Sequence, residues 1–315
     1  MDTSTVGLSR QRSRVGLKKP APRFWEYAMT RRASIETALE QNLPLSPERR
    51  ESRFNEAVKY AVFPGGKRLR PVLTMLGAEL FGLSGSEVIH SAAGVEFVHT
   101  SSLIFDDMPS MDDAVERRGK APLHDRFGEE VATLVAIGLL NTSYRLVTLD
   151  SSEDPAASLA AVHEIVDCVG PSGMVGGQTA DLAINGTECH ECRTENDRLS
   201  KNLKTSALVR LALRLGAIYA GADNSSLNSL TDFAESLGNA YQIRDDLTDI
   251  QEDAAASAFY IKPSTAALSL AVQRSHDILA SDFPASPARD CLAELIDYMA
   301  APPTHVNFTN NLQAV

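Results

Sequence analysis

The sequence predicts an all-α protein that folds as one domain from residue 24 to residue 315. Aliphatic residues recur at spacings of three and four, which is the period of helices with one buried face. Long alternations of Val, Ile and Thr, which would indicate β-strands, are missing. Glycine and proline gather in short groups at helix-length intervals, and no Gly/Ser-rich linker divides the chain. These groups lie at 63–66, 82–85, 119–122, 170–173, 221 and 284–287.

The N-terminal segment, residues 1–23, differs from the rest in its charge. Its six basic residues face a single acidic one, Asp2. We expect a disordered basic tail, with an organelle-targeting peptide as the alternative. The segment lacks the apolar core of a secretion signal, so secretion is not indicated.

Two apolar segments predict buried helices. The segment His90–Phe105 is apolar almost all round, which suits a central helix. The segment Val131–Leu140 is the most apolar of the chain and stops at Asn141. Neither approaches the roughly 20 apolar residues that a membrane-spanning helix needs, so no transmembrane segment is predicted.

Charge and cysteine content exclude some classes of function. The chain has 30 basic and 41 acidic residues among 315, a net charge of −11, which argues against a nucleic-acid-binding surface. An anionic substrate remains compatible, because a local basic pocket or bound cations can invert the field. Four scattered cysteines do not make a disulfide framework, which favours a reducing compartment and a cytoplasmic protein.

Two clusters of aspartates are the first sign of chemistry. One runs from Asp106 to Asp113 at the end of the predicted central helix, and the other is Asp245-Asp246-Leu247-Thr248-Asp249. Asp245 and Asp249 are four residues apart and share a helix face, where bare carboxylates repel each other. A divalent cation such as Mg²⁺ turns that repulsion into a ligand set. A solvated acidic face would explain one cluster, but both adjoin strongly apolar helices.

Basic residues form separate short groups that could meet phosphates. Three cations, Lys67, Arg68 and Arg70, follow a Gly-Gly turn; Arg117-Arg118 follows the first acidic cluster, and Lys204 lies further on. Arginine suits bidentate phosphate recognition, and lysine provides a point contact. Several phosphate contacts around two metal sites suggest two diphosphate-bearing substrates.

Six motifs together resemble the trans-isoprenyl diphosphate synthase (polyprenyl synthetase) family, and most closely the bacterial geranylgeranyl diphosphate synthases of carotenoid pathways. They lie in the family's order between about residues 55 and 250. The motifs are GGKRLRP, HTSSLIFDDMPSMDD, RRGK, GQTADL, KTSAL and YQIRDDLTD. The resemblance implies the isoprenoid synthase fold, a bundle of about ten or more helices around a deep central cavity, and a homodimer.

The resemblance also implies a role for each matching residue. The metal ligands, for about three Mg²⁺ ions with substrate bound, would be Asp106, Asp107, Asp112, Asp245, Asp246 and Asp249. The allylic diphosphate would be held by Arg117, and isopentenyl diphosphate by Lys67, Arg70, His99 and Arg118. The reacting region would be lined by Lys204, Thr205 and Gln242.

The implied reaction joins isopentenyl diphosphate to an allylic diphosphate. Metal ions and cations stabilise the departing diphosphate, the alkene attacks the allylic cation, and a proton is lost. In this family, bulk below the first motif limits chain length. Small residues, Ser101 and Ser102, stand at the fifth and fourth positions before Asp106. They predict a C20 product, geranylgeranyl diphosphate, with the C15 farnesyl diphosphate as second choice.

One segment departs from the family pattern. The glycine-lysine-aspartate loop that usually follows the second motif is replaced by a glycine-free stretch, residues 250–265. The loop looks shortened, and Lys262 is its only candidate lysine. Two alternatives to a working synthase therefore stay open: a divergent Mg²⁺-dependent terpene cyclase, and a weakly active subunit that regulates a partner synthase.

Overall fold

The computed structural model describes residues 23–47, 52–150, 154–186, 200, 203, 206–252 and 258–300. Within these residues the chain is helical, as predicted, and its only extended pairing is an isolated bridge between Arg117 and Lys120. The helices are α1 (Arg23–Gln41), α2 (Arg53–Val62), α3 (Leu69–Glu79), the 3₁₀ helix η1 (Gly85–Val88), α4 (Ile89–Asp106), α5 (Leu123–Phe127), α6 (Glu129–Leu146), α7 (Pro155–Val169), α8 (Met174–Gly186), α10 (Ala207–Tyr219), α11 (Asn224–Glu252), α12 (Ala258–Asp282) and α13 (Pro287–Ala300). Each predicted Gly/Pro group falls between two of them or ends on the first residue of the next one.

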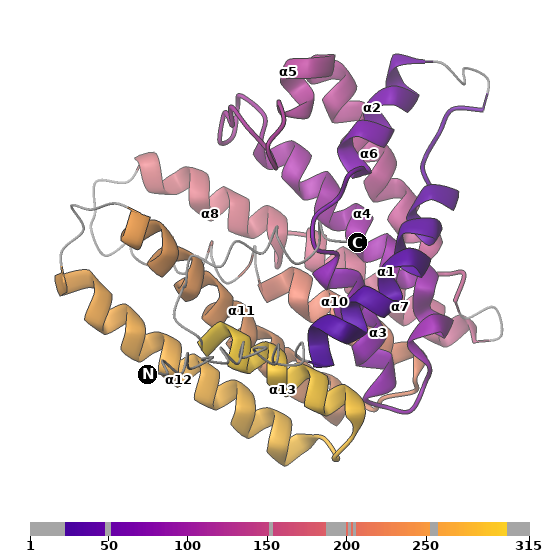
Figure 1. Cartoon of the computed structure of the whole chain (residues 1–315). Helices are drawn as coiled ribbons and strands as arrows, with labels where there is room; N and C mark the ends of the chain where they lie inside the picture. The colour runs from indigo at the N-terminus through magenta and orange to yellow at the C-terminus, as the bar shows by residue number, and fades with distance from the viewer. Residues whose placement is uncertain are drawn as a thin grey trace, which may run out of the picture.

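Helices α3, α4 and α10 form the centre of the bundle (Figure 1). Two glycines let α3 and α10 approach closely: a Cβ on Gly77 would lie 2.2 Å from the carbonyl oxygen of Leu213, and one on Gly216 would lie 2.1 Å from that of Thr74. Helix α4 is buried for most of its length, as its apolar sequence predicts. The centre is therefore rigid and suited to hold side chains in place.

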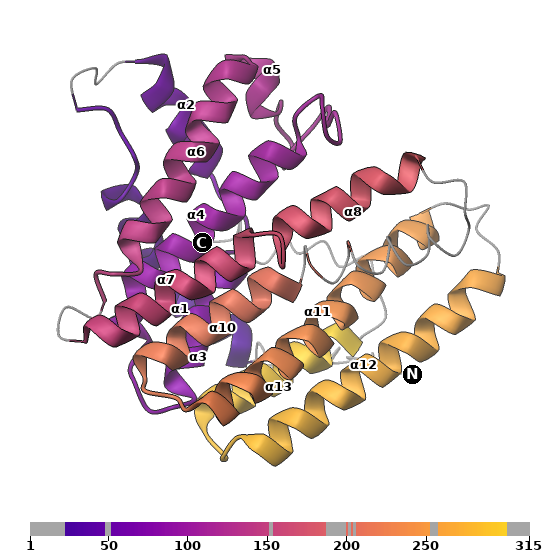
Figure 2. The same cartoon turned by 180° about the vertical axis from the view of Figure 1, so that it is seen from behind.

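The C-terminal helices form a layer beside this centre. Helices α11 and α12 run side by side in both views, and α13 packs on them and on α1 and α3 (Figure 2). Trp25 of α1 meets Tyr298 of α13 edge to face, with ring centroids 5.6 Å apart. Tyr298 also lies under the guanidinium of Arg244, 4.0 Å from its ring centroid, which joins α13 to α11. The second aspartate motif is thereby anchored to the bundle.

Helix α6 is less buried than its apolar sequence predicts. Leu134 and Ile137 are 57% and 51% exposed. On α7, Leu159 and Val166 lie seven residues apart on one face and are 58% and 50% exposed. The period of α6 could not reveal this, because a helix that is apolar all round has no polar face to mark its solvent side. No helix in the described part of the chain is long and apolar enough to cross a membrane.

Candidate functional site

The first aspartate motif lies at the C-terminal end of α4 and in the turn that follows. The backbone N–H of Asp112 donates to the carbonyl of Asp106 at 2.9 Å, which folds the turn back over the helix end. Asp113 closes the turn with a positive φ of 48°. Asp106 lines a cavity described below, and Asp112 is exposed. Two carboxylates of the motif thus lie in one compact turn.

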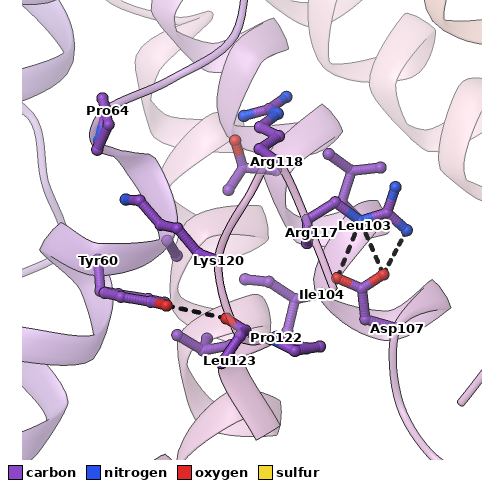
Figure 3. A pocket seen from close by; sticks show the side chains of 13 residues that line it. Tyr60, Pro64, Leu103, Ile104, Asp107, Arg117, Arg118, Lys120, Pro122 and Leu123 are labelled. Carbon is purple, nitrogen blue, oxygen red and sulfur yellow. Dashed lines mark hydrogen bonds and ion pairs between the residues drawn. The ribbon is translucent and has the colours of Figure 1, made fainter. Parts of the chain in front are cut away.

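Asp107 has a different environment from these two. It is 4% exposed, and its carboxylate accepts hydrogen bonds from Arg117 Nε at 2.9 and 3.1 Å and from Arg117 Nη2 (Figure 3). This pairing raises the pKa of Arg117. Beside the pair is a small cavity of about 50 Å³, where the Tyr60 hydroxyl donates to the Ala121 carbonyl at 2.9 Å. In this structure Asp107 is the counterion of an arginine.

A cationic pocket of about 330 Å³ lies between the Gly-Gly turn, α4 and the Arg117–Arg118 loop. At its centre, His99 Nε2 is 3.1 Å from Arg70 Nη1 and 3.5 Å from Arg118 Nη2. A guanidinium can only donate, so this nitrogen must accept. Burial, followed by the fields of Arg70 and Arg118, lowers the pKa of His99 well below 6.5. His99 is therefore neutral at pH 7. The lining includes Lys67, Arg70, His99, Arg117 and Arg118, which are the predicted diphosphate contacts.

The cations of this pocket are partly desolvated and close together. Burial lowers the pKa of Lys67, of Arg70 and of Arg118, and neighbouring cations lower each further. Such a cluster favours an anion that replaces the lost hydration. The geometry suits a diphosphate, which accepts several charge-assisted hydrogen bonds at once.

Arg68, the third cation of the predicted group, also lines this pocket, but its guanidinium is engaged by two carboxylates. It is 2% exposed, and its guanidinium binds Glu96, which is buried, and Glu36, which is partly exposed. All three cations of the motif therefore line the pocket, and Arg68 is held there by a pair of carboxylates. The signal for this arrangement is Glu96, an acidic residue in an apolar helix, whose burial requires a partner.

A second cavity, also of about 330 Å³, lies on another side of α4 and has a mainly apolar lining. Phe105, Met111, Leu140 and Met174 contribute to it, and Asp106 lies at its edge. Ser101 and Ser102 line it as well. Their hydroxyls donate to the carbonyls of Ala136 at 3.0 Å and His99 at 2.9 Å, so their hydrogen-bonding needs are met by the backbone. These two side chains leave space without presenting an unpaired polar group.

Other predicted residues are described only in part. Lys204 and Thr205 lie outside the described residues. Asp245 is exposed on α11 and Gln242 is half-buried on the same helix. Asp246 and Asp249 also belong to α11, but the structure does not describe their side chains or that of Lys262.

The predicted loop after the second motif is short in the structure. Helix α11 ends at Glu252 and α12 begins at Ala258, which places Lys262 on a helix. Sequence reasoning missed Tyr241, which lines the cationic pocket. Across the described residues, no three His, Cys, Asp or Glu side chains converge to form a metal site by themselves.

A cationic pocket and an apolar cavity on one central helix define a class: an all-α protein whose site suits an amphipathic anion. A polyprenyl synthetase family model matches residues 51–258. The chain belongs to the polyprenyl synthetase family.

Named relatives agree with this assignment. Geranylgeranyl pyrophosphate synthase 11, chloroplastic, from Arabidopsis thaliana is 36% identical over 231 residues, which is 73% of this chain and 64% of the relative. The heterodimeric geranylgeranyl pyrophosphate synthase large subunit 1, chloroplastic, from the same plant is 35% identical over 72% of this chain and 61% of its own length. The chain thus spans less than two thirds of these relatives. The crystal structure of an FPP/GFPP synthase from Zymomonas mobilis superposes with a TM-score of 0.78 at 28% identity, covering 88% of this chain and 99% of the other.

Proposed function

We propose that the protein is a Mg²⁺-dependent trans-prenyltransferase that condenses isopentenyl diphosphate with an allylic diphosphate, giving geranylgeranyl diphosphate. The observation that carries this is the division of α4 between two cavities. Glu96, His99 and Leu103, at helical spacings of three and four, line the cationic pocket. Val98, Ser101, Ser102, Phe105 and Asp106 line the apolar one. Head and tail of an isoprenoid diphosphate need such a pair of environments.

The residues of the chain divide the work of the reaction. Lys67, Arg70, His99 and Arg118 bind the diphosphate of isopentenyl diphosphate, and Arg117 that of the allylic substrate. The apolar cavity holds the growing chain and keeps water from the allylic cation. The departing diphosphate is stabilised by fixed positive groups that need no reorganisation.

The donor chemistry of the first motif fits Mg²⁺. This ion usually takes one or two carboxylates and completes its shell with water and substrate phosphate oxygens. Asp106 and Asp112, folded into one turn, supply such oxygens, so a ready-made cluster of three side chains is not required. Asp245, Asp246 and Asp249 would serve from α11. Bound Mg²⁺ would neutralise charge on the leaving diphosphate.

The product length follows from the apolar cavity. Two small side chains at Ser101 and Ser102 leave the cavity open toward Leu140 and Met174, which favours a C20 over a C15 product. Lys204, Thr205 and Gln242 would complete the reacting region, and Lys262 would contact the diphosphate from α12.

We also propose that the protein forms a homodimer through the exposed apolar faces of α6 and α7. Leu134, Ile137, Leu159 and Val166 supply the apolar surface that a second copy would cover. One relative is named as the large subunit of a heterodimeric synthase, so a different partner is the competing outcome. We place the enzyme in the cytoplasm. Import into an organelle through residues 1–23 is the alternative, and a fluorescent fusion of that segment would decide.

The test is to incubate purified protein with Mg²⁺, isopentenyl diphosphate and, separately, the C5, C10 and C15 allylic diphosphates, and to identify products by mass spectrometry. We expect a C20 diphosphate that is lost with a chelator and reduced at least a hundredfold by Asp106→Ala. Asp232→Ala, which removes an exposed carboxylate on α11, is the matched control and should keep full activity. A cyclic hydrocarbon would instead identify a cyclase, and inactivity with every starter would favour the regulatory-subunit alternative.

A further inference from the structure

The structure assigns to Arg68 a role as a positioning residue: held by Glu36 and Glu96, it fixes the direction in which Lys67 and Arg70 face the diphosphate pocket. The inference deepens the proposed function and rests on it. It concerns how the pocket is built: Arg68 is among the residues that line the pocket, but its guanidinium is held by Glu36 and Glu96.

The backbone at Arg68 is unusual. It has φ 54° and ψ 35°, the left-handed region, at the N-cap of α3. A non-glycine residue in this region is strained, and the conformation persists where its surroundings determine it. This conformation turns the chain from the Gly-Gly turn into α3. The directions of Lys67 and Arg70 on either side depend on it.

The side chain of Arg68 supplies the compensation. Its Nε and Nη2 donate to the two oxygens of Glu36, both at 3.0 Å, and its Nη1 donates to Glu96 at 2.6 Å. Nη2 also donates to the carbonyl of Val62 at 2.9 Å. The guanidinium lies over the ring of Phe63, 5.7 Å from its centroid. Four hydrogen bonds therefore fix one buried side chain from three directions.

The Gly-Gly turn leaves room for this arrangement. A Cβ on Gly65 would lie 1.9 Å from Arg68 Cζ, so the guanidinium occupies the space of a side chain. A Cβ on Gly66 would lie 3.2 Å from Nη2 of Arg118, a cation of the pocket. The two glycines thus allow two arginines, one structural and one facing the pocket, to pack against the same turn.

Glu96 connects this network to the pocket electrostatically. It lines the pocket and is 2% exposed. Its negative charge raises the pKa of Arg70 and of Arg118, which burial lowers. Two effects of Glu96 on diphosphate binding therefore have opposite signs. As a negative charge beside an anion site it weakens binding, whereas as the anchor of Arg68 it strengthens binding. A neutral substitution at Glu96 shows which of the two effects is larger.

The experiment measures the Kd of isopentenyl diphosphate by calorimetry, without an allylic partner, together with steady-state KM values for both substrates. We expect Glu96→Gln to raise the Kd and KM of isopentenyl diphosphate about tenfold, since small misplacements of binding groups are costly. The KM of the allylic diphosphate should change by less than about twofold, because its proposed contact Arg117 is held by Asp107. A shift in one KM alone is a result that general loss of stability does not produce.

The matched control is Glu164→Gln. Glu164 on α7 binds Arg214 on α10 at 2.8 and 2.5 Å, a comparable carboxylate–guanidinium pair that does not line the cationic pocket. This variant should lower the Tm and leave both KM values unchanged. If Glu96→Gln does not fold, Arg68→Lys keeps the cation and loses the planar set of donors, and the same increase in Kd is expected.

Two results would overturn the assignment in distinguishable ways. If Glu96→Gln binds isopentenyl diphosphate as tightly as the wild type does, or more tightly, the positioning role is contradicted and the proposed function still stands. Wild-type protein that neither binds nor condenses isopentenyl diphosphate would contradict the proposed function, and the positioning role with it.

Discussion

Replacing His99 by Gln should make the protein less sensitive to acid. In the folded protein the imidazole accepts hydrogen bonds from Arg70 and Arg118 and stays neutral, because burial and both cations lower its pKa well below 6.5. In the unfolded chain it takes up a proton near its ordinary pKa of 6.5. The unfolded state therefore binds more protons as the pH falls. Stability due to His99 is complete above pH 6.5 and is lost below it.

The magnitude follows from linkage. Between pH 7.5 and pH 5.5 a histidine that titrates only in the unfolded chain reduces the free energy of unfolding by about 1.4 kcal/mol. Gln does not titrate, yet its side-chain oxygen can accept from the same arginines. The loss of stability between the two pH values should thus be about 1.4 kcal/mol smaller in His99→Gln than in wild type.

Urea titrations followed by far-UV circular dichroism at both pH values measure this difference. Comparing the two pH values within each protein removes any loss that the substitution causes at both. His163→Gln, on an exposed position of α7, should keep the wild-type dependence. An equal loss of stability in wild type and His99→Gln would refute the neutral, buried imidazole at the centre of the pocket.

Two further predictions concern the apolar surfaces. Ser102→Phe places an aromatic ring in the apolar cavity, so the main product should shorten from C20 to C15 or C10. Mass spectrometry of the products tests this. An unchanged C20 product would show that the chain grows elsewhere. Ile137→Glu places a charge on the exposed face of α6 and should convert a dimer into monomers in light-scattering measurements. The single copy should still fold, because the side chain is 51% exposed in it. A dimer that persists would mean that α6 lies outside the interface.

The sequence predicted the helices well because their signals are local. The period of apolar residues and the Gly/Pro groups both act within a few residues. Helices α2, α3, α7, α10 and α12 each end just before a predicted group. Burial of whole helices was harder to predict. Helices α4 and α6 are both apolar in sequence, but α4 has neighbours on most sides and α6 leaves Leu134 and Ile137 uncovered. That difference depends on which elements pack together, a property that no single segment contains.

The site shows the same limit at the level of side chains. The three neighbouring cations Lys67, Arg68 and Arg70 carry the same charge. In the structure the middle one, Arg68, differs from the others in its left-handed backbone conformation. Its partners, Glu36 and Glu96, lie about 30 residues away in either direction. Spacing along the chain could not identify these pairs. An acidic residue within the most buried helix is the local sign that such a partner exists.

The end of α4 gives two adjacent aspartates different surroundings. Successive residues of a helix point about 100° apart, and Asp106 and Asp107 line different cavities. Asp106 follows the face of Ser102 and lies at the edge of the apolar cavity, while Asp107 follows the face of Thr100 and Ile104 and meets Arg117. Arg117 in turn lines the cationic pocket. The end of the helix therefore places one carboxylate at the apolar cavity and the next on Arg117, a residue of the cationic pocket.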